Sequence, residues 1–355
     1  MRILLVVIIL INPLSRIYSQ NELADTSYVQ ETNVNEESCN YWSIDLPVST
    51  AGISIGNSAY FNGIRINFKD CGVGQINGLN VTFWQSRKTD NAEVNGISLG
   101  LAPSAARLNG LNLGIAALVS TRHSYGVNIG LLASVSEGDQ TGFNLGGLAV
   151  VTEGDMSFIN IGGLAVVSQG NSSGLNFGGL ATVSEGNKRG INIGGLANVA
   201  EGNMYGLNLS GLANVSEMNV YGINFAGLAQ VAGADLYGLT IAGLAIVAES
   251  NMKGIGVSLG KIAGGYSISG LHFTGYKIET KDLAGISGSI AWIETDYMKG
   301  VGISVFNQIR KQQQGITIGL VNFTEVLHGL QIGLINIAEN NPAPFKILPV
   351  INAHF

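Results

Sequence analysis

A glycine returns at a fixed interval along most of this chain, and this period constrains its fold more than any other feature. Between residues 110 and 270 the interval is always 16 residues, and it shortens to 15 and then 14 towards residue 329. The unit starts are Gly110, Gly126, Gly142, Phe158, Gly174, Gly190, Gly206, Gly222, Gly238, Gly254, Gly270, Gly285, Gly300, Gly315 and Gly329. Such self-similarity predicts a repeat architecture. Helical repeats are excluded, because apolar residues do not recur at spacings of three and four and every unit contains internal glycines.

Each unit has the internal pattern of two short strands. In the copy GINIGGLANVAEGNMY (190–205), the first segment has one apolar residue on each side of Asn. A Gly pair and a second apolar segment follow, and the turn EGN closes the unit. Gly and Asn tolerate the positive φ angles of tight turns. We therefore expect two strands joined at a Gly corner, with the apolar residues beside Asn pointing inward and about five apolar side chains buried per unit.

Two all-β architectures accommodate such a unit. One is a tandem-repeat β-solenoid in which every 14–16-residue unit forms one coil. The other is an antiparallel outer-membrane β-barrel in which every unit forms one strand and a turn. The barrel is supported by the alternation of residues 207–216 between an apolar and a more polar face, and by the alternating tail that ends at Phe355.

Three features favour the solenoid. The shorter units lose a residue at the Gly pair, and a deletion inside one continuous strand would turn every later side chain to the opposite face. The constant spacing leaves no room for the long loops that barrels carry on one side. The third feature is a column of asparagines that could hydrogen-bond along parallel coils as amides do in cross-β assemblies. Its members are Asn112, Asn128, Asn144, Asn160, Asn176, Asn192, Asn208 and Asn224.

The composition divides the chain into five segments. We predict a signal peptide (1–20), a polar leader (21–41), an irregular β N-terminal cap (42–95), the β repeat array (96–338) and a proline-containing C-terminal cap (339–355). The signal peptide is predicted from Arg2 followed by the apolar run 3–11, which is too short to span a bilayer as a helix. The protein is therefore expected to be exported.

Charge and cysteine content restrict the partners. Residues 1–20 carry Arg2, Arg16 and no acid, so their removal takes the net charge from −6 to −8. An acidic chain without a basic cluster disfavours nucleic acid and anionic lipid head groups as partners. Cys39 and Cys71 are the two cysteines, and an exported chain permits one disulfide between them, with two unpaired thiols as the alternative.

An acidic column is the sharpest candidate for ligand binding. One unit position carries Glu137, Glu153, Gln169, Glu185, Glu201, Glu217 and Glu249. Two positions later stand Asp139, Asp155, Asn171, Asn187, Asn203, Asn219, Asp235 and Asn251. Ca²⁺ between coils would relieve the repulsion of stacked carboxylates. Solvated turn carboxylates, with Asn and Asp shaping the turn, are the favoured interpretation, so no metal site is assigned.

Other candidate sites are weaker. Tyr205, Tyr221 and Tyr237 form a short column, with Tyr125 apart, that could stack against a polysaccharide or simply pack at the turn. Gly254-Ile255-Gly256 resembles part of a dinucleotide loop but lacks the following helix. The histidines are His123, His272, His328 and His354, and they stand far apart in sequence. Neither catalytic nor cofactor-binding residues are assigned, and a polysaccharide hydrolase or lyase is the least supported function considered.

The units GLNLSGLANVSE and the ending GLQIGLINIAENNPAPFKILPVINAHF resemble a family of bacterial surface-repeat proteins over about residues 50–355. That family consists of exported proteins of Gram-negative bacteria, and the resemblance implies placement at the cell surface or outer membrane without catalytic residues. The expected function is a structural or adhesive role at the bacterial cell surface, without catalysis, towards a surface or envelope partner. The alternative is an integral outer-membrane barrel, as a pore or surface antigen.

Overall fold

The computed structural model describes residues 39–47, 50–87 and 90–355, and the residues from Asn40 onward form one compact unit. The predicted signal peptide and nearly all of the predicted leader lie outside the described residues. Within the part described, every regular element is a β-strand.

The strands of the first coils are β1 (Ser43–Leu46), β2 (Ala51–Gly56), β3 (Tyr60–Cys71), β4 (Gln75–Arg87), β5 (Glu93–Gly100), β6 (Ser104–Gly114) and β7 (Ala117–Gly130). The regular array contains β8 (Ala133–Ser136), β9 (Gln140–Gly146), β10 (Ala149–Thr152), β11 (Met156–Gly162), β12 (Ala165–Ser168), β13 (Ser172–Gly178), β14 (Ala181–Ser184), β15 (Lys188–Gly194), β16 (Ala197–Ala200), β17 (Met204–Ser210), β18 (Ala213–Ser216), β19 (Val220–Ala226), β20 (Ala229–Ala232), β21 (Leu236–Ala242), β22 (Ala245–Ala248), β23 (Asn251–Ser258), β24 (Lys261–Gly264) and β25 (Ser267–Thr274). The last coils contain β26 (Lys277–Glu279), β27 (Asp282–Ser289), β28 (Trp292–Ile303), β29 (Phe306–Ile318), β30 (Val321–Ala338) and β31 (Ile347–His354).

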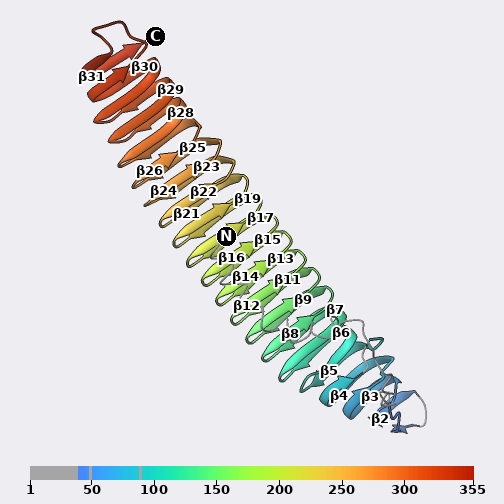
Figure 1. Ribbon diagram of the computed structural model, residues 1–355. Coiled ribbons are helices and arrows are strands. Elements are labelled where there is room, and N and C mark those ends of the chain that lie inside the picture. Colours follow the sequence, from blue (N-terminus) through green and yellow to red (C-terminus); the bar gives the residue numbers. More distant parts are fainter. Residues whose placement is uncertain (1–38, 48–49, 88–89) are drawn as a thin grey trace, which may run out of the picture. The chain divides into compact units, whose positions relative to one another are not determined.

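Neighbouring coils pair in parallel and in register. In the array a seven-residue strand pairs with the equivalent strand of the next coil, as β17 does with β19, and a four-residue strand does the same, as β18 does with β20. The protein is therefore a β-solenoid of about 17 stacked coils (Figure 1). We call the longer strand of each coil strand one and the shorter strand two.

The two strands of a coil meet at the predicted Gly corner. Between β17 and β18 the corner is Gly211–Leu212, and between β18 and β19 the turn is 217–219. The shortened coils lose residues beside these two places. Strand one ends one residue earlier in the coil that begins at Gly300 than in the coil that begins at Gly285, and strand two before the turn is one residue shorter in β26 than in β24. The unit-start glycines thus stay in parallel register across every change of length, and irregularities at 295–297 and 309–312 take up the differences between coils.

The two ends of the coil stack are closed by antiparallel strands. At the start β1 pairs antiparallel with β2, while β2 to β5 already pair in parallel, so most of the segment 42–95 forms coils rather than an irregular cap. At the end β31 pairs antiparallel with β30 despite Pro349 within it. Each closing strand satisfies the main-chain groups that the terminal coil would otherwise leave unpaired.

The glycine at each unit start is required by its backbone conformation. Gly190 has φ 101°, and a Cβ built there would lie 2.2 Å from the carbonyl oxygen of Gly174 in the preceding coil. Gly206 has the same φ and the same 2.2 Å approach to Gly190. The Gly interval in the sequence therefore marks one backbone bend per coil, and these bends stack so closely that a side chain would obstruct them.

Phe158 occupies one of these positions and keeps a positive φ of 85° with 65% of its side chain exposed. Replacing it by Gly should stabilise the protein by about 1 kcal/mol, because a residue with a Cβ is strained in this region by roughly that amount. Phe158→Ala is the matched control, since it removes the ring but keeps the strain. A gain in the free energy of unfolding for Ala as large as for Gly would contradict this explanation.

The predicted asparagine column forms a continuous ladder in the interior. Each amide Nδ2 donates to the Oδ1 of the asparagine in the next coil at 2.7–2.9 Å, from Asn112 to Asn224, and all eight side chains are fully buried. Asn224 then donates to Thr240 Oγ1 at 3.4 Å. Every inner member both donates and accepts, which removes the penalty of burying an amide.

The expected direction of the apolar residues beside Asn is wrong. Because Asn points inward, the residues on either side of it point outward, and 44% of Ile223 and 37% of Phe225 are exposed. The interior instead contains the Asn, small residues such as Ala226 and Ala232, and in most coils a larger side chain two residues before the unit-start Gly, such as Leu236. Each coil thus buries fewer apolar side chains than the five expected.

A buried ion pair lies near the start of the inner column. Arg65 takes the register position that Asn80 holds in the following coil, and its side chain is fully buried. Its guanidinium donates to Asp70 at 2.6 Å, to Asn80 Oδ1 at 2.7 Å and to the Ser58 carbonyl at 3.0 Å. Thr82 donates to the other oxygen of Asp70 at 2.6 Å. The pair is therefore hydrogen-bonded on both sides, as a buried ion pair requires.

Candidate functional site

The turn edge of the array carries a second ladder. The main-chain N–H of each Asn or Asp in the predicted turn column donates to the side-chain Oδ1 of its equivalent one coil earlier at 2.7–3.2 Å, from Asp155 onto Asp139 through to Asn251 onto Asp235. These side chains therefore shape and connect the turns, which agrees with the favoured interpretation from the sequence. An aspartate serves as well as an asparagine here because only the acceptor oxygen is needed.

The glutamate column lies beside this ladder and is exposed. Burial, followed by the charges of Glu185 and Glu217, raises the pKa of Glu201 above its ordinary value. Burial, followed by the charges of Glu153 and Asp90, raises the pKa of Glu137 in the same way. Stacked carboxylates thus repel one another, as the sequence indicated, and ionisation of this column opposes folding.

Replacing Glu201 by Gln should stabilise the protein slightly at neutral pH, by a few tenths of a kcal/mol, as is typical of exposed charges. The pKa is raised in the folded state, so stability is lost as pH rises from 4.5 through the folded pKa, and the gain from Gln should vanish below pH 4.5. Added salt should also reduce it. Glu249→Gln is the matched control, because Gly233 and Gly265 flank Glu249 in the column. Equal gains at both positions in thermal melts would refute a role for neighbouring charge.

The calcium hypothesis gains no support from a ligand cluster. Throughout residues 39–47, 50–87 and 90–355, no group of three or more His, Cys, Asp or Glu side chains is placed to hold a metal ion.

The tyrosine column is stacked. The rings of Tyr205 and Tyr221, and of Tyr221 and Tyr237, lie 5.1 Å apart and within 5° of parallel. The guanidinium of Arg189 lies 5.4 Å from the centre of the Tyr205 ring, one coil earlier. These half-buried rings therefore pack mainly on one another along the stack and expose their edges.

The structure separates two of the histidines and brings two together. His123 lies 3.8 Å from Asp139, and His272 is buried in the inner column, where its Nε2 lies 3.2 Å from the Ser269 carbonyl. Burial lowers the pKa of His272. His328 and His354 meet at the C-terminal end with ring centres 5.9 Å apart, a contact that their sequence separation did not reveal.

The Gly254-Ile255-Gly256 segment has a structural explanation. Gly254 is a unit start with φ 130°. Gly256 takes the inner position, and a Cβ there would lie 2.7 Å from His272 Nδ1 in the next coil. The second glycine therefore makes room for His272 rather than for a phosphate.

Sequence reasoning missed an ion-pair network on the outer face of strand two in the later coils. Lys261 binds Glu279 at 2.7 Å, Lys277 bridges Glu279 and Glu294 at 3.1 and 2.5 Å, and Arg310 also binds Glu294. A hydrogen bond from Lys261, and to a smaller extent one from Lys277, lowers the pKa of Glu279. In earlier coils the equivalent register positions hold Ala and Val, so the face changes from apolar to charged near β24.

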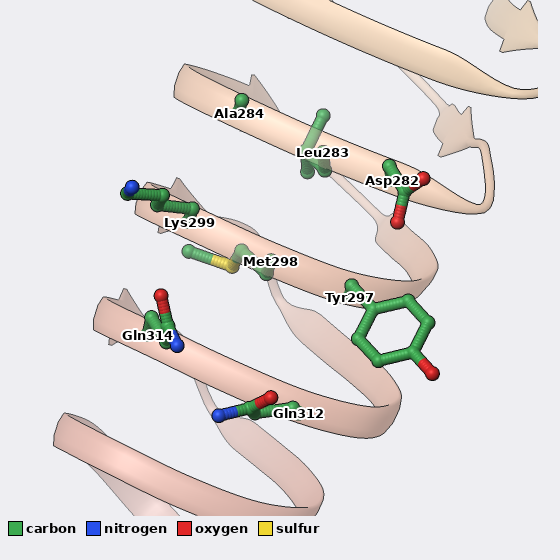
Figure 2. Close-up of a pocket in the computed structure, with 8 residues that line it drawn as sticks. All are labelled: Asp282, Leu283, Ala284, Tyr297, Met298, Lys299, Gln312 and Gln314. Carbon is green, nitrogen blue, oxygen red and sulfur yellow. The ribbon is translucent and has the colours of Figure 1, made fainter.

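A shallow groove crosses three of these coils. Figure 2 shows Asp282, Tyr297 and Gln312 along one side and Ala284, Lys299 and Gln314 along the other. Leu283 and Met298 lie between them and are buried. The groove is the gap between two outward-facing columns of β27 to β29. Its charged lining residues are Asp282 on one side and Lys299 on the other.

Comparison with known protein families, with curated proteins and with solved structures found no match to this chain. Both cysteines, Cys39 and Cys71, are disulfide-bonded, as the first of the two sequence alternatives allowed. In the part of the chain that the structure describes, no helix is long and apolar enough to cross a membrane.

Proposed function

We propose that the protein is an exported, non-catalytic repeat protein that acts at the bacterial cell surface as an extended structural or adhesive scaffold. The observation that carries this proposal is the repetition of the outer surface. Equivalent residues of successive coils stand in register, about 4.8 Å apart as in any β-ladder, over about 17 coils. Such a surface can repeat one weak contact with a partner in every coil, and linked weak contacts bind more tightly together than each does alone.

Export to the cell surface is supported by the disulfide-bonded cysteines and by the predicted signal peptide. It is tested by adding protease to intact cells of the source organism. The coil stack should be cleaved without lysis of the cells. Protection until lysis would contradict surface placement.

The scaffold role is tested by removing whole coils. Deleting residues 206–237 removes two units and joins Tyr205 to Gly238, which preserves the register of every column. The shortened protein should remain folded, and its retention on envelope preparations of the source organism should fall by a modest factor. Deleting residues 206–229 removes one and a half units and serves as the control that should fail to fold. Complete loss of envelope binding after the two-unit deletion would indicate a single localised site instead.

A further inference from the structure

The outer face of strand one is an almost uninterrupted apolar surface. Its two columns are the residues immediately before and after the inner Asn position, such as Ile223 and Phe225, and we call it the strand-one face. Every member from Ile53 to Ile332 is exposed or half-buried, none is charged, and Gly288 alone lacks an apolar side chain. A soluble chain rarely leaves so large a contiguous apolar surface uncovered.

We propose that a second copy of this chain covers the strand-one face, so that two solenoids pack face to face. This inference goes beyond the scaffold function and does not depend on it. The area supports it: two columns about 10 Å wide over about 17 coils of 4.8 Å give on the order of 800 Å² per copy. That is the area each partner contributes to a stable protein–protein interface.

The shape of the face is complementary to itself. Phenylalanines replace the aliphatic residues after the inner position at Phe177, Phe225 and Phe273, which is every third coil. These rings are therefore spaced by about 14 Å along the stack. Rings at an equal spacing on one copy fit between the rings of another copy displaced by half that spacing. Close packing of this kind is what distinguishes a specific interface from a general apolar surface.

Charge favours a second copy over lipid. A membrane-binding apolar face normally carries basic residues along its polar margin. Here the net charge is −6, and the turn edge carries the exposed glutamate column. A second copy needs no such basic margin, because the two strand-one faces are uncharged.

The test measures the mass of the purified full-length protein in solution by light scattering after gel filtration, without detergent. Twice the chain mass of 37.1 kDa is expected, less any cleaved leader. The double variant Ile223→Lys, Phe225→Lys should raise the dissociation constant at least about 100-fold, because it buries unpaired charges at the interface. Met218→Lys, Ala234→Lys adds the same charges at the turn edge and should leave the dimer intact.

A second variant guards against loss of folding. Ile223→Thr, Phe225→Thr keeps a high strand propensity and should also weaken the dimer while circular dichroism stays unchanged. A wild-type monomer at about 100 μM, or a dimer unaffected by both strand-one variants, would overturn the inference. So would flotation of a monomer with phosphatidylcholine vesicles, which would identify lipid as the occupant. None of these results bears on surface placement or on the coil-deletion experiment.

Discussion

Replacing Asn208 by Asp should lower the free energy of unfolding by about 3–5 kcal/mol at neutral pH, the size expected when a buried network acquires an unpaired charge. Asn208 is fully buried, accepts from Asn192 at 2.8 Å and donates to Asn224 at 2.8 Å. An ionised carboxylate still accepts the first bond but cannot donate the second. It would instead face the Oδ1 of Asn224 across the interior.

The defect should be relieved by acid. Burial raises the pKa of the introduced carboxyl, and its protonated form can donate to Asn224 as the amide does. The folded variant therefore binds a proton more tightly than the unfolded chain, so its deficit against wild type should shrink as pH falls from 8 to 4. Thermal denaturation at both pH values measures this change.

The turn ladder provides the control for this substitution. Asn203→Asp introduces the same charge at a half-buried turn position, where Asp155 and Asp235 already accept main-chain N–H bonds in other coils. It should cost less than about 1 kcal/mol. Equal losses at Asn203 and Asn208 would mean that the inner ladder is not buried as described.

Replacing Lys188 by Met should stabilise the protein by about 2 kcal/mol at neutral pH, within the range found when buried charged groups give way to apolar ones. Lys188 is fully buried in the column that holds Met204 in the next coil. Its ammonium has two partners, the carbonyl and the hydroxyl of Thr182. Burial accordingly lowers the pKa of Lys188 well below its ordinary value.

The sign of the pH dependence follows from that shift. Below the ordinary pKa of 10.5 the unfolded chain carries the proton, while the folded chain resists it, so this lysine opposes folding most at low pH. The advantage of Met should therefore be largest in acid and should shrink as pH approaches 10.5. Lys253→Met, at an exposed position, is the control and should show little change. If the gain in the free energy of unfolding from Met did not vary with pH, it would come from packing alone.

The period and composition of the unit were enough to predict the solenoid, the Gly corner and the Asn ladder. The residue lost at the Gly pair of the shorter units carried the argument for two strands per coil, because a deletion inside one continuous strand would turn every later side chain to the opposite face. These features depend on sequence spacing alone, so no three-dimensional information was needed.

The interior face could not be predicted in the same way. Alternation along a strand shows that Asn224 and its neighbour Ile223 point in opposite directions, but not which of them points inward. The general preference for buried apolar residues favoured Ile223. In the structure the hydrogen-bonded ladder places Asn inside instead. The sequence signal for this inner position was that Asn is constant over eight coils, whereas its neighbours vary among Leu, Ile, Val and Phe.

The remaining contacts depend on which residues the register brings together. His328 and His354 meet only because β31 folds back antiparallel on β30. Lys277 and Glu294 meet because Lys277 pairs with Trp292 in the next coil, which places Glu294 two residues further along the same outer face. Neither contact follows from a motif.

The parallel register is tested most directly by a disulfide between equivalent positions of two coils. Ala213 and Ala229 are register partners in β18 and β20, 16 residues apart, where Cα atoms about 4.8 Å apart suit a disulfide. The pair Ala213→Cys, Ala229→Cys should crosslink on mild oxidation, as detected by peptide mass mapping, whereas Ala213→Cys with Gln230→Cys should not, because residue 230 points into the interior. Failure of the first pair to crosslink, or equal crosslinking of both pairs, would contradict the solenoid.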